Sequence, residues 1–180
     1  MIEIRVSDST LLEARNMAEE LGKLYNSITS GQGNVAGFIG ELVCKNLLNA
    51  EHCNTKDYDL ILPDGLKVDV KTKRTSVKPK PEYDCSVAKL SLHQQCDAYA
   101  FCRVKNDYTL CWFLGLIGHD EYFSKAKFLE KGDIDPSNNY TVKSSCYNLS
   151  IKDLQSEEIS FRYRDEQHTQ HDLDLCDTGC

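Results

Sequence analysis

Three acidic side chains and one lysine have the types and the spacing that metal-dependent phosphodiester chemistry requires. Asp59 precedes Asp69 by ten positions, Lys71 follows two positions later, and Glu41 lies upstream in a glycine-rich stretch. Carboxylate oxygens bind hard divalent cations, and a neighbouring ammonium acts as a base or as an electrostatic partner of the phosphate. If the fold brings these four groups together, they form a site suited to phosphodiester hydrolysis.

A β-hairpin with a three-residue loop explains the spacing of the two aspartates. Two strand-like runs, residues 58–62 and 66–71, are joined by a loop that begins with Pro63 and ends with Gly65. Proline suits the first central position of a type I turn, and glycine suits the left-handed position that follows it.

This loop also fixes which side chains share a face of the hairpin. It places Leu60 opposite Val68 and Asp59 opposite Asp69. Because side chains alternate along a strand, the two aspartates and Lys71 then lie on the face away from the aliphatic side chains. On spacing alone, an ordinary hairpin with a solvated charged face is an equal alternative.

Glu41 is expected on a helix over residues 35–49. Apolar residues recur there with a period of 3.6, namely Val35, Phe38, Ile39, Leu42, Val43 and Leu47. Gly37 and Gly40 leave the flank around Glu41 almost bare, although glycine inside a helix costs about 1 kcal/mol relative to alanine. We therefore expect the helix backbone to approach a sheet or a ligand closely, with Asn34 as the N-cap. In isolation, Glu41 is more typical of a solvated helix surface.

The combined pattern resembles the PD-(D/E)XK nuclease superfamily, which has the restriction-endonuclease-like fold. The resemblance is best over residues 34–105. In it, Asp59 matches the first acid, Asp69 the second acid, Lys71 the lysine and Glu41 the helical glutamate.

The resemblance implies a small phage or microbial nuclease that uses Mg²⁺, with Mn²⁺ as a substitute ion. Glu41, Asp59, Asp69 and the Val70 carbonyl would hold one or two ions. Such an ion activates water and stabilises charge on the attacked phosphate. Lys71 would orient or deprotonate that water, or offset charge in the transition state. The sequence leaves these roles open, as it does one-metal versus two-metal catalysis.

Basic residues crowd the segment that leaves the second strand of the hairpin. Lysine and arginine side chains are common phosphate contacts that position nucleic acid without reading its sequence. We therefore expect contacts to nucleic acid from Asn34, Lys73, Arg74, Lys78 and Lys80. An ordinary solvated basic loop is the alternative.

A polar group lies just before the next predicted strand. His93, Gln94 and Gln95 precede residues 97–105. In the architecture of the PD-(D/E)XK superfamily, a polar side chain at this junction would contact a phosphate. A helix end with solvated amides explains these residues equally well.

Composition sets wider limits on the function. The 180 residues carry a net charge of −7. The last sixteen residues, 165–180, hold five acidic side chains and no lysine or arginine, so the rest carries −2. A local basic patch on such a body is compatible with DNA binding. The nine cysteines include no Cys-x-x-Cys pair, and no long apolar run is present. We therefore expect reduced thiols in a cytoplasmic protein that does not span a membrane, located in the host cytoplasm if a phage encodes it.

The order of predicted elements indicates one α/β domain, a mixed β-sheet flanked by helices, over residues 1–164. An acidic, flexible tail is expected to follow at 165–180. Strands are expected at 2–6, 57–62, 66–72, 84–89, 97–105, 108–117, 140–147 and 157–163, with helices at 7–25, 35–49, 89–95 and 119–126.

Two function classes remain after the sequence is read. The first is a Mg²⁺-dependent deoxyribonuclease, an endonuclease on duplex or branched DNA, with a homodimer as one arrangement. RNA is an alternative substrate within this class. The second is a catalytically silent nucleic-acid-binding or interaction module on the same fold. The intact set of three acids and a lysine favours catalysis.

Overall fold

The computed structural model describes residues 1–21, 34–53, 55–136 and 139–154. In these ranges the elements in chain order are β1 (Ile2–Arg5), α1 (Asp8–Leu21), α2 (Asn34–Leu47), β2 (Glu51–His52), β3 (Leu60–Ile61), β4 (Lys67–Thr75), β5 (Asp84–Ala88), the 3₁₀ helix η1 (Lys89–His93), β6 (Ala98–Lys105), β7 (Leu110–Gly118), α3 (His119–Lys125), β8 (Lys127–Leu129), β9 (Ile134–Asp135), β10 (Tyr140–Thr141), β11 (Cys146–Ser150) and the 3₁₀ helix η2 (Ile151–Asp153).

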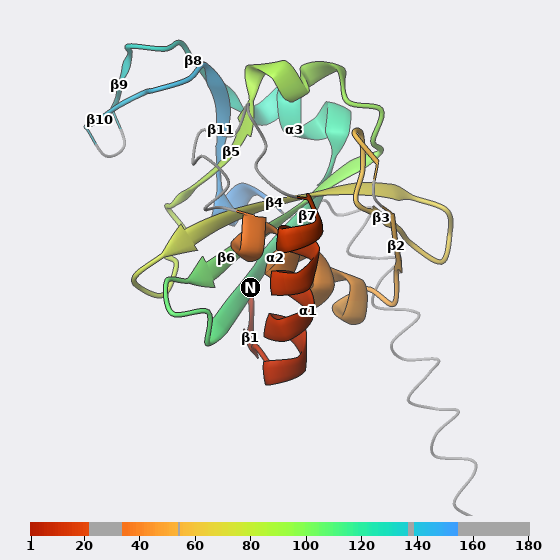
Figure 1. Ribbon diagram of the computed structural model, residues 1–180. Coiled ribbons are helices and arrows are strands. Elements are labelled where there is room, and N and C mark those ends of the chain that lie inside the picture. Colours follow the sequence, from red (N-terminus) through yellow and green to blue (C-terminus); the bar gives the residue numbers. More distant parts are fainter. Residues whose placement is uncertain (22–33, 54, 137–138, 155–180) are drawn as a thin grey trace, which may run out of the picture.

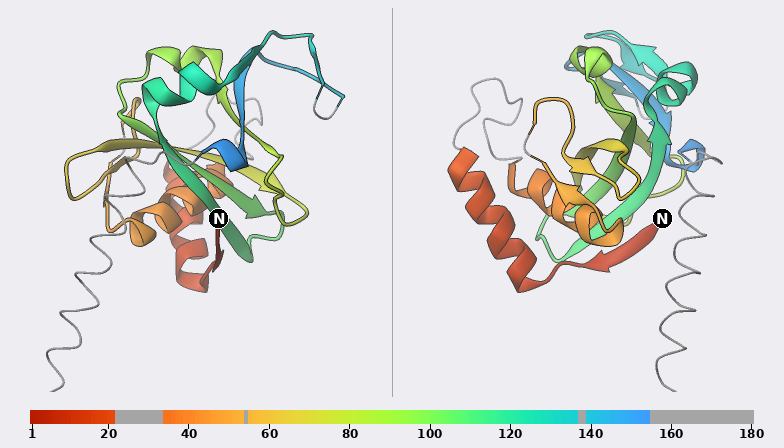
Figure 2. Two further views of the ribbon diagram at one scale, coloured as in Figure 1. Left: turned by 180° about the vertical axis from the view of Figure 1, so that it is seen from behind. Right: turned by 90° about the vertical axis from the view of Figure 1, so that its right-hand side faces the viewer.

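The main sheet is mixed, as the sequence predicts. Its strand order is β1-β7-β6-β4-β3-β2. Strands β4 and β6 run parallel, with Asp69 beside Tyr99 and Lys71 beside Phe101, and the other neighbours are antiparallel. A parallel pair needs a long connection, and β5 and η1 lie within it. Helices α1 and α2 cover one side of this sheet, and α3 lies on the other side (Figures 1 and 2).

The predicted strands do not all join the main sheet. Strand β5 leaves the main sheet and pairs with β11, which also pairs with β8, and a separate ribbon contains β9 and β10. The predicted strand at 140–147 is two strands, β10 and β11, and the predicted helix at 89–95 is the shorter η1. The predicted strand at 157–163, the tail at 165–180 and the end of the first helix lie outside the described residues.

Two hydrophobic cores lie on the two sides of the main sheet. One is formed by α1 and α2 against Val68, Val70, Ala98 and Ala100. The other contains Tyr99, Phe101, Trp112, Tyr122 and Leu149. It lies beneath α3 and the three-stranded sheet β5-β11-β8, called the second sheet below. Cys44, Cys96, Cys102 and Cys111 are buried, as expected of cysteines that act as small hydrophobic side chains. The alternation along β4 therefore sends Asp69 and Lys71 toward the second core and the valines toward the helices.

Among the described residues, no helix combines the length and the apolar composition needed to cross a membrane.

Candidate active site

The predicted hairpin is present with the predicted register. Leu60 pairs with Val68, and the Leu62 N–H donates to the Leu66 carbonyl at 2.9 Å. Gly65 has a φ of +86°, the left-handed conformation that the loop requires. The turn residues therefore determine the strand alignment, and with it the face on which the charged side chains lie.

Regular strand pairing ends at Asp59, where a side-chain hydrogen bond to β4 replaces the next backbone bond. The Asp59 N–H donates to the Val68 carbonyl at 3.0 Å, while its Oδ2 accepts the Val70 N–H at 2.7 Å. This bond holds the Asp59 carboxyl group against β4, next to Asp69. Burial and then the negative charges of Asp69 and Glu41 raise the pKa of Asp59 to about 8. Asp59 is therefore close enough to both Asp69 and Glu41 to be repelled by each of them.

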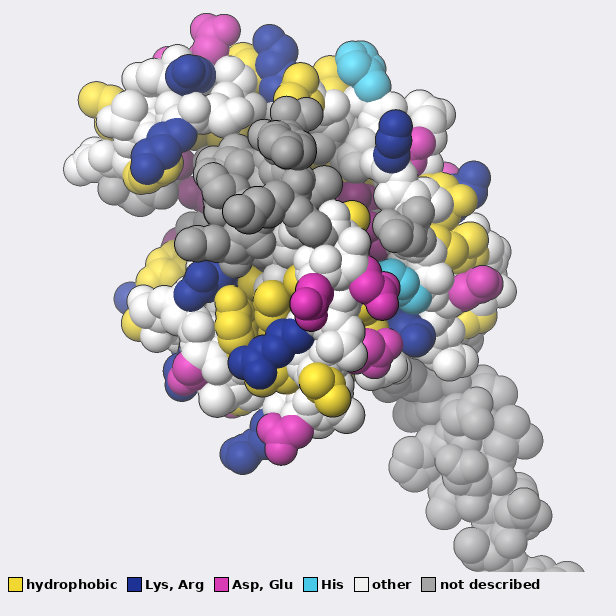
Figure 3. All heavy atoms as spheres, viewed as in Figure 1, with side chains coloured by type: hydrophobic (Ala, Val, Ile, Leu, Met, Phe, Trp, Pro, Cys, Tyr) yellow, Lys and Arg dark blue, Asp and Glu magenta, His cyan; other side chains and the backbone are white. Residues whose placement is uncertain are grey.

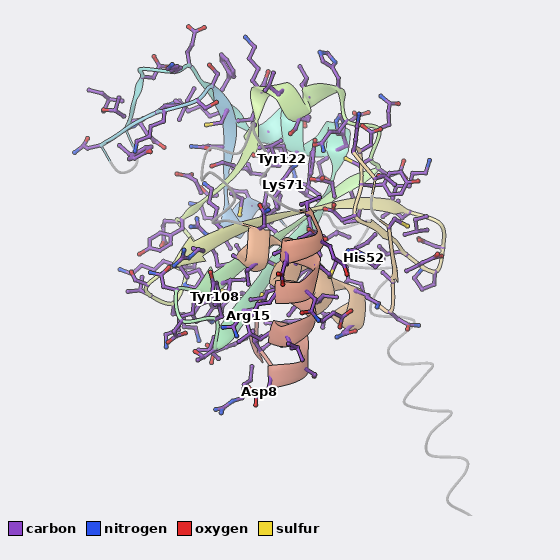
Figure 4. All side chains as sticks on the ribbon, viewed as in Figure 1. Asp8, Arg15, His52, Lys71, Tyr108 and Tyr122 are labelled. Atoms are coloured by element: carbon purple, nitrogen blue, oxygen red, sulfur yellow. The ribbon has the colours of Figure 1, made fainter. Side chains whose placement is uncertain are left out.

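Asp69, Lys71 and Gln94 form the most tightly connected part of the site. The side chain of Asp69 is almost wholly buried, and Lys71 Nζ lies 2.6 Å from Asp69 Oδ2. Gln94 connects both groups, because its Oε1 accepts from Lys71 Nζ at 3.2 Å and its Nε2 donates to Asp69 Oδ1 at 3.1 Å. Lys71 Nζ also lies 5.7 Å from the ring centroid of Tyr99, on the side of β4 that faces α3 (Figure 4).

Glu41 reaches this region from α2, which packs tightly on β4. A Cβ added to Gly40 would come within 2.0 Å of Thr72 Oγ1, so only glycine permits the observed approach. This confirms the predicted close contact between helix and sheet at Gly40. A Cβ added to Gly37 would meet only Glu41 Oε1, at a distance of 4.0 Å. Glu41 Oε2 lies 2.9 Å from His52 Nε2, which anchors the carboxylate toward β2.

The donor chemistry of this cluster fits a hard divalent cation. Asp69 Oδ2 is buried and has no hydrogen-bond partner, because its contact with Lys71 lacks hydrogen-bond geometry. A cation would relieve the repulsion that Asp69 and Glu41 exert on Asp59, and the carboxylate oxygens are ligands that such a cation prefers. Within the described ranges, however, no three His, Cys, Asp or Glu side chains already form a metal-binding group. Glu41 contacts His52 and Asp69 contacts Lys71 instead.

The residues predicted to contact nucleic acid are spread along β4 and beyond it. Lys73 Nζ donates to Ser86 Oγ at 2.6 Å, and Arg74 lies over the ring of Tyr108 at 5.6 Å. Lys78 forms an ion pair with Glu3 of β1 at 3.2 Å. Lys80 lines a cleft beside β5. The alternation along β4 places Lys73 on the Lys71 face and Arg74 on the opposite face.

Asn34 is the first residue of α2, and the residue before it lies outside the described ranges.

Two residues that contact the predicted site, Gln94 and His52, are not among the site residues that the sequence predicts. Gln94 belongs to the polar group before β6, and the structure supports a role at the site over a merely solvated helix end. His52 gives no signal in the sequence, because β2 has only two residues and pairs with β3, which is equally short.

Comparison with protein-family models finds no match, and no curated protein matches the chain.

Proposed function

We propose that this protein is a metal-dependent deoxyribonuclease with a restriction-endonuclease-like fold, cutting DNA as an endonuclease. The observation that carries the proposal is the meeting of Asp59, Asp69 and Lys71 at one end of the β3–β4 hairpin, with Glu41 near enough to shift the Asp59 pKa. Buried acids that repel one another are a common preparation for a catalytic metal ion.

The proposed fold rests on the arrangement around this hairpin. The parts that the resemblance implies are a mixed sheet, a helix that carries Glu41 and a hairpin that carries both aspartates, and the structure contains them. They come in the same chain order as in the motif. This agreement supports the assignment in the absence of a sequence match.

The proposed chemistry assigns a separate task to each group. Asp59, Asp69, Glu41 and the Val70 carbonyl would hold Mg²⁺ or Mn²⁺, which supplies an activated water and charge stabilisation. Lys71 offers a positive charge next to Asp69, where it can orient water or stabilise the phosphate as negative charge develops. Gln94 fixes both Asp69 and Lys71, so neither side chain has to be ordered when substrate arrives.

A catalytically silent binding module is the second candidate. The observation in its favour is that Lys71 already compensates the charge of Asp69, an arrangement that is stable without any cation. A binding module would bind nucleic acid in the presence of Mg²⁺ and leave it uncut.

Cleavage assays separate these two functions. Purified protein is incubated with supercoiled plasmid, linear duplex, branched DNA, single-stranded DNA and RNA, with Mg²⁺, with Mn²⁺ or with a chelator. We expect metal-dependent cutting of DNA by the wild type and its loss in Asp69→Asn and Lys71→Ala. Lys105→Ala removes one lysine at the far end of β6 and serves as the matched control. Cutting of RNA alone would reassign the substrate.

The outcome against the proposal is equally definite. If folded wild-type protein cuts none of these substrates with either ion, or if Lys71→Ala cuts as fast as Lys105→Ala, the nuclease assignment fails. Circular dichroism of each variant shows whether a loss of activity reflects a loss of fold.

A further inference from the structure

A large cleft opens between the end of β4 and the second sheet. Its volume is about 710 Å³, and its walls come from the β4 end, from β5 and from the β10–β11 segment. Lys73, Lys80, Arg103 and Lys143 supply positive charge to these walls. Of these four, only Lys73 and Lys80 are expected from the sequence to contact nucleic acid.

The cleft is connected to the proposed active site. A smaller hollow of about 310 Å³ is lined by Lys71, and it shares Lys73, Asp84, Ser86 and Arg103 with the larger cleft. Lys71 and Lys73 are two residues apart on β4, so their Cα atoms lie roughly 7 Å apart on the same face of the strand. A chain of phosphates that leaves Lys71 in this direction therefore meets Lys73 next.

The polar groups of the shared wall are held in place. Lys73 Nζ donates to Ser86 Oγ at 2.6 Å, and Arg103 Nη2 donates to the Asp84 carbonyl at 2.7 Å. Burial of the ammonium, and then the charge of Arg103, lower the pKa of Lys73. The residue Lys73 as a whole is exposed, so its aliphatic stem faces solvent while its ammonium group is enclosed by the cleft. Asp84 offsets part of the repulsion between these two cations, and a phosphate beside them would offset more of it.

The far wall adds aromatic surface. Tyr140 of β10 is 51% exposed and lines the cleft together with the exposed Lys143. An aromatic ring beside cations is the combination that single-stranded nucleic acid uses, because bases stack on the ring while phosphates meet the charges. Three acids, Glu82, Asp84 and Asp135, also line the cleft, so its four cations exceed its acids by one. Asp135 accepts a hydrogen bond from Asn148 Nδ2 at 3.1 Å.

The size of the cleft suits a few nucleotides of a single strand. Its volume of about 710 Å³ is that of a pocket for a small ligand. A duplex would need a broad basic surface instead. On the face seen in Figure 3, lysine and arginine side chains are interspersed with acids and form no such surface.

We propose that the cleft between β4 and the β10–β11 segment binds a single-stranded polynucleotide, with Lys73, Arg103 and Lys143 on its phosphates and Tyr140 stacked on a base. This inference deepens the proposed function and rests on it, because the bound strand leads to Lys71. A nuclease with such a cleft acts where DNA is already unpaired, at a flap, a gap, an end or a branch.

Equilibrium binding tests the inference apart from catalysis. A fluorescent oligothymidylate, the matching oligouridylate and a blunt duplex are titrated with full-length protein in a chelator, so that cleavage cannot occur. We expect oligothymidylate to bind more tightly than the duplex. Tyr140→Ala should weaken binding at least about fivefold, because base stacking on an aromatic ring contributes that much or more. Tyr140→Phe keeps the ring and should bind like the wild type.

Charge variants complete the test. Lys143→Ala should weaken binding and reduce its salt dependence. Arg15→Ala removes one charge from α1, on the other side of the sheet, and should bind like the wild type (Figure 4). Equal affinity for duplex and single strand, or unchanged binding in both Tyr140→Ala and Lys143→Ala, would overturn the inference.

The two proposals fail in different ways. Tight binding of oligothymidylate that depends on Tyr140, without any cleavage when metal is added, leaves the cleft in place and removes the nuclease. If the wild type cuts DNA and the cleft variants bind oligothymidylate as tightly as the wild type, the nuclease proposal stands and the cleft proposal fails. The oligouridylate arm shows whether the strand is DNA or RNA, since both present the same phosphates and stacking faces.

Discussion

Gly40 of α2 faces Thr72 of β4 so closely that a single added methyl group would lie 2.0 Å from Thr72 Oγ1. This contact sets the distance between the helix that carries Glu41 and the strand that carries Asp69 and Lys71. Thr72 Oγ1 is itself buried without a hydrogen-bond partner. The close packing of α2 on β4 at this point therefore depends on van der Waals contact and not on a hydrogen bond. The position of Glu41 therefore depends on a glycine next to it.

Gly40→Ala should destabilise the protein by about 1–3 kcal/mol, the usual cost of inserting a methyl group into a packed contact. This cost exceeds the gain of up to about 1 kcal/mol that alanine brings to a helix. Gly37→Ala is the matched control, because a Cβ there meets only Glu41 Oε1 at 4.0 Å, and it should stabilise the helix slightly. Urea unfolding in a chelator measures the free energy of unfolding of both variants.

Thr72, the partner of Gly40, allows a double-mutant test of the same contact. Thr72→Ala loses no hydrogen bond and removes the atom nearest to the added methyl group. The double variant should therefore be destabilised less than the sum of its two single variants. Strict additivity would show that the contact does not limit the approach of the helix.

Asp59→Asn should stabilise the metal-free protein at pH 8 more than at pH 5. The folded state raises the pKa of this carboxyl from 3.8 to about 8, chiefly through burial and then through Asp69 and Glu41. A raised pKa means that the protonated form supports folding. That contribution is complete below about pH 4 and is lost as the pH rises toward 8, where the carboxylate must ionise. Asparagine carries no charge and retains an acceptor for the Val70 N–H.

Thermal unfolding in a chelator at the two pH values measures this difference. Asp57→Asn removes one negative charge two residues earlier and controls for net charge. Equal shifts in Tm for Asp59→Asn at pH 5 and pH 8 would refute the electrostatic description of the site.

Gln94→Ala should reduce cleavage by roughly 10- to 100-fold, the range found when a group that orients metal ligands is removed. Gln94 bonds both Asp69 and Lys71, so its loss frees the two groups together. Gln95→Ala is the control, because the Gln95 amide donates only to the carbonyl of His93 among the bonds described. Initial cleavage rates of the two variants are compared at saturating Mg²⁺. Similar rates for the two variants would contradict a positioning role for Gln94.

What the sequence predicts well is the part of the fold that local chemistry determines. Pro63 and Gly65 specify the turn, the turn specifies the pairing of Leu60 with Val68, and that register places the charged side chains. The helix around Glu41 is equally local, because its apolar stripe and its two glycines lie within fourteen residues.

What the sequence does not predict depends on contacts between distant segments. Strand β5 pairs with β11, about sixty residues later, and neither strand carries a signal that separates it from the main sheet. His52 contacts Glu41 because the two-residue β2 pairs with β3, and strands this short have no periodicity to read. The sequence likewise predicts a single strand through Tyr140 and Lys143, whereas in the structure β10 and β11 are separate and the segment between them lines the cleft.

His52→Ala should raise the Mg²⁺ concentration needed for half-maximal cleavage by roughly 10- to 100-fold, because the orientation of Glu41 depends on it. His52 Nε2 lies 2.9 Å from Glu41 Oε2, and both side chains are largely buried, at 18% and 15% exposure. His93→Ala removes an exposed histidine and is the control. His52→Gln retains a hydrogen-bond donor and should recover part of the affinity. If His52→Ala needs no more Mg²⁺ than His93→Ala, then Glu41 takes its place without His52, and α2 alone determines where its carboxylate lies.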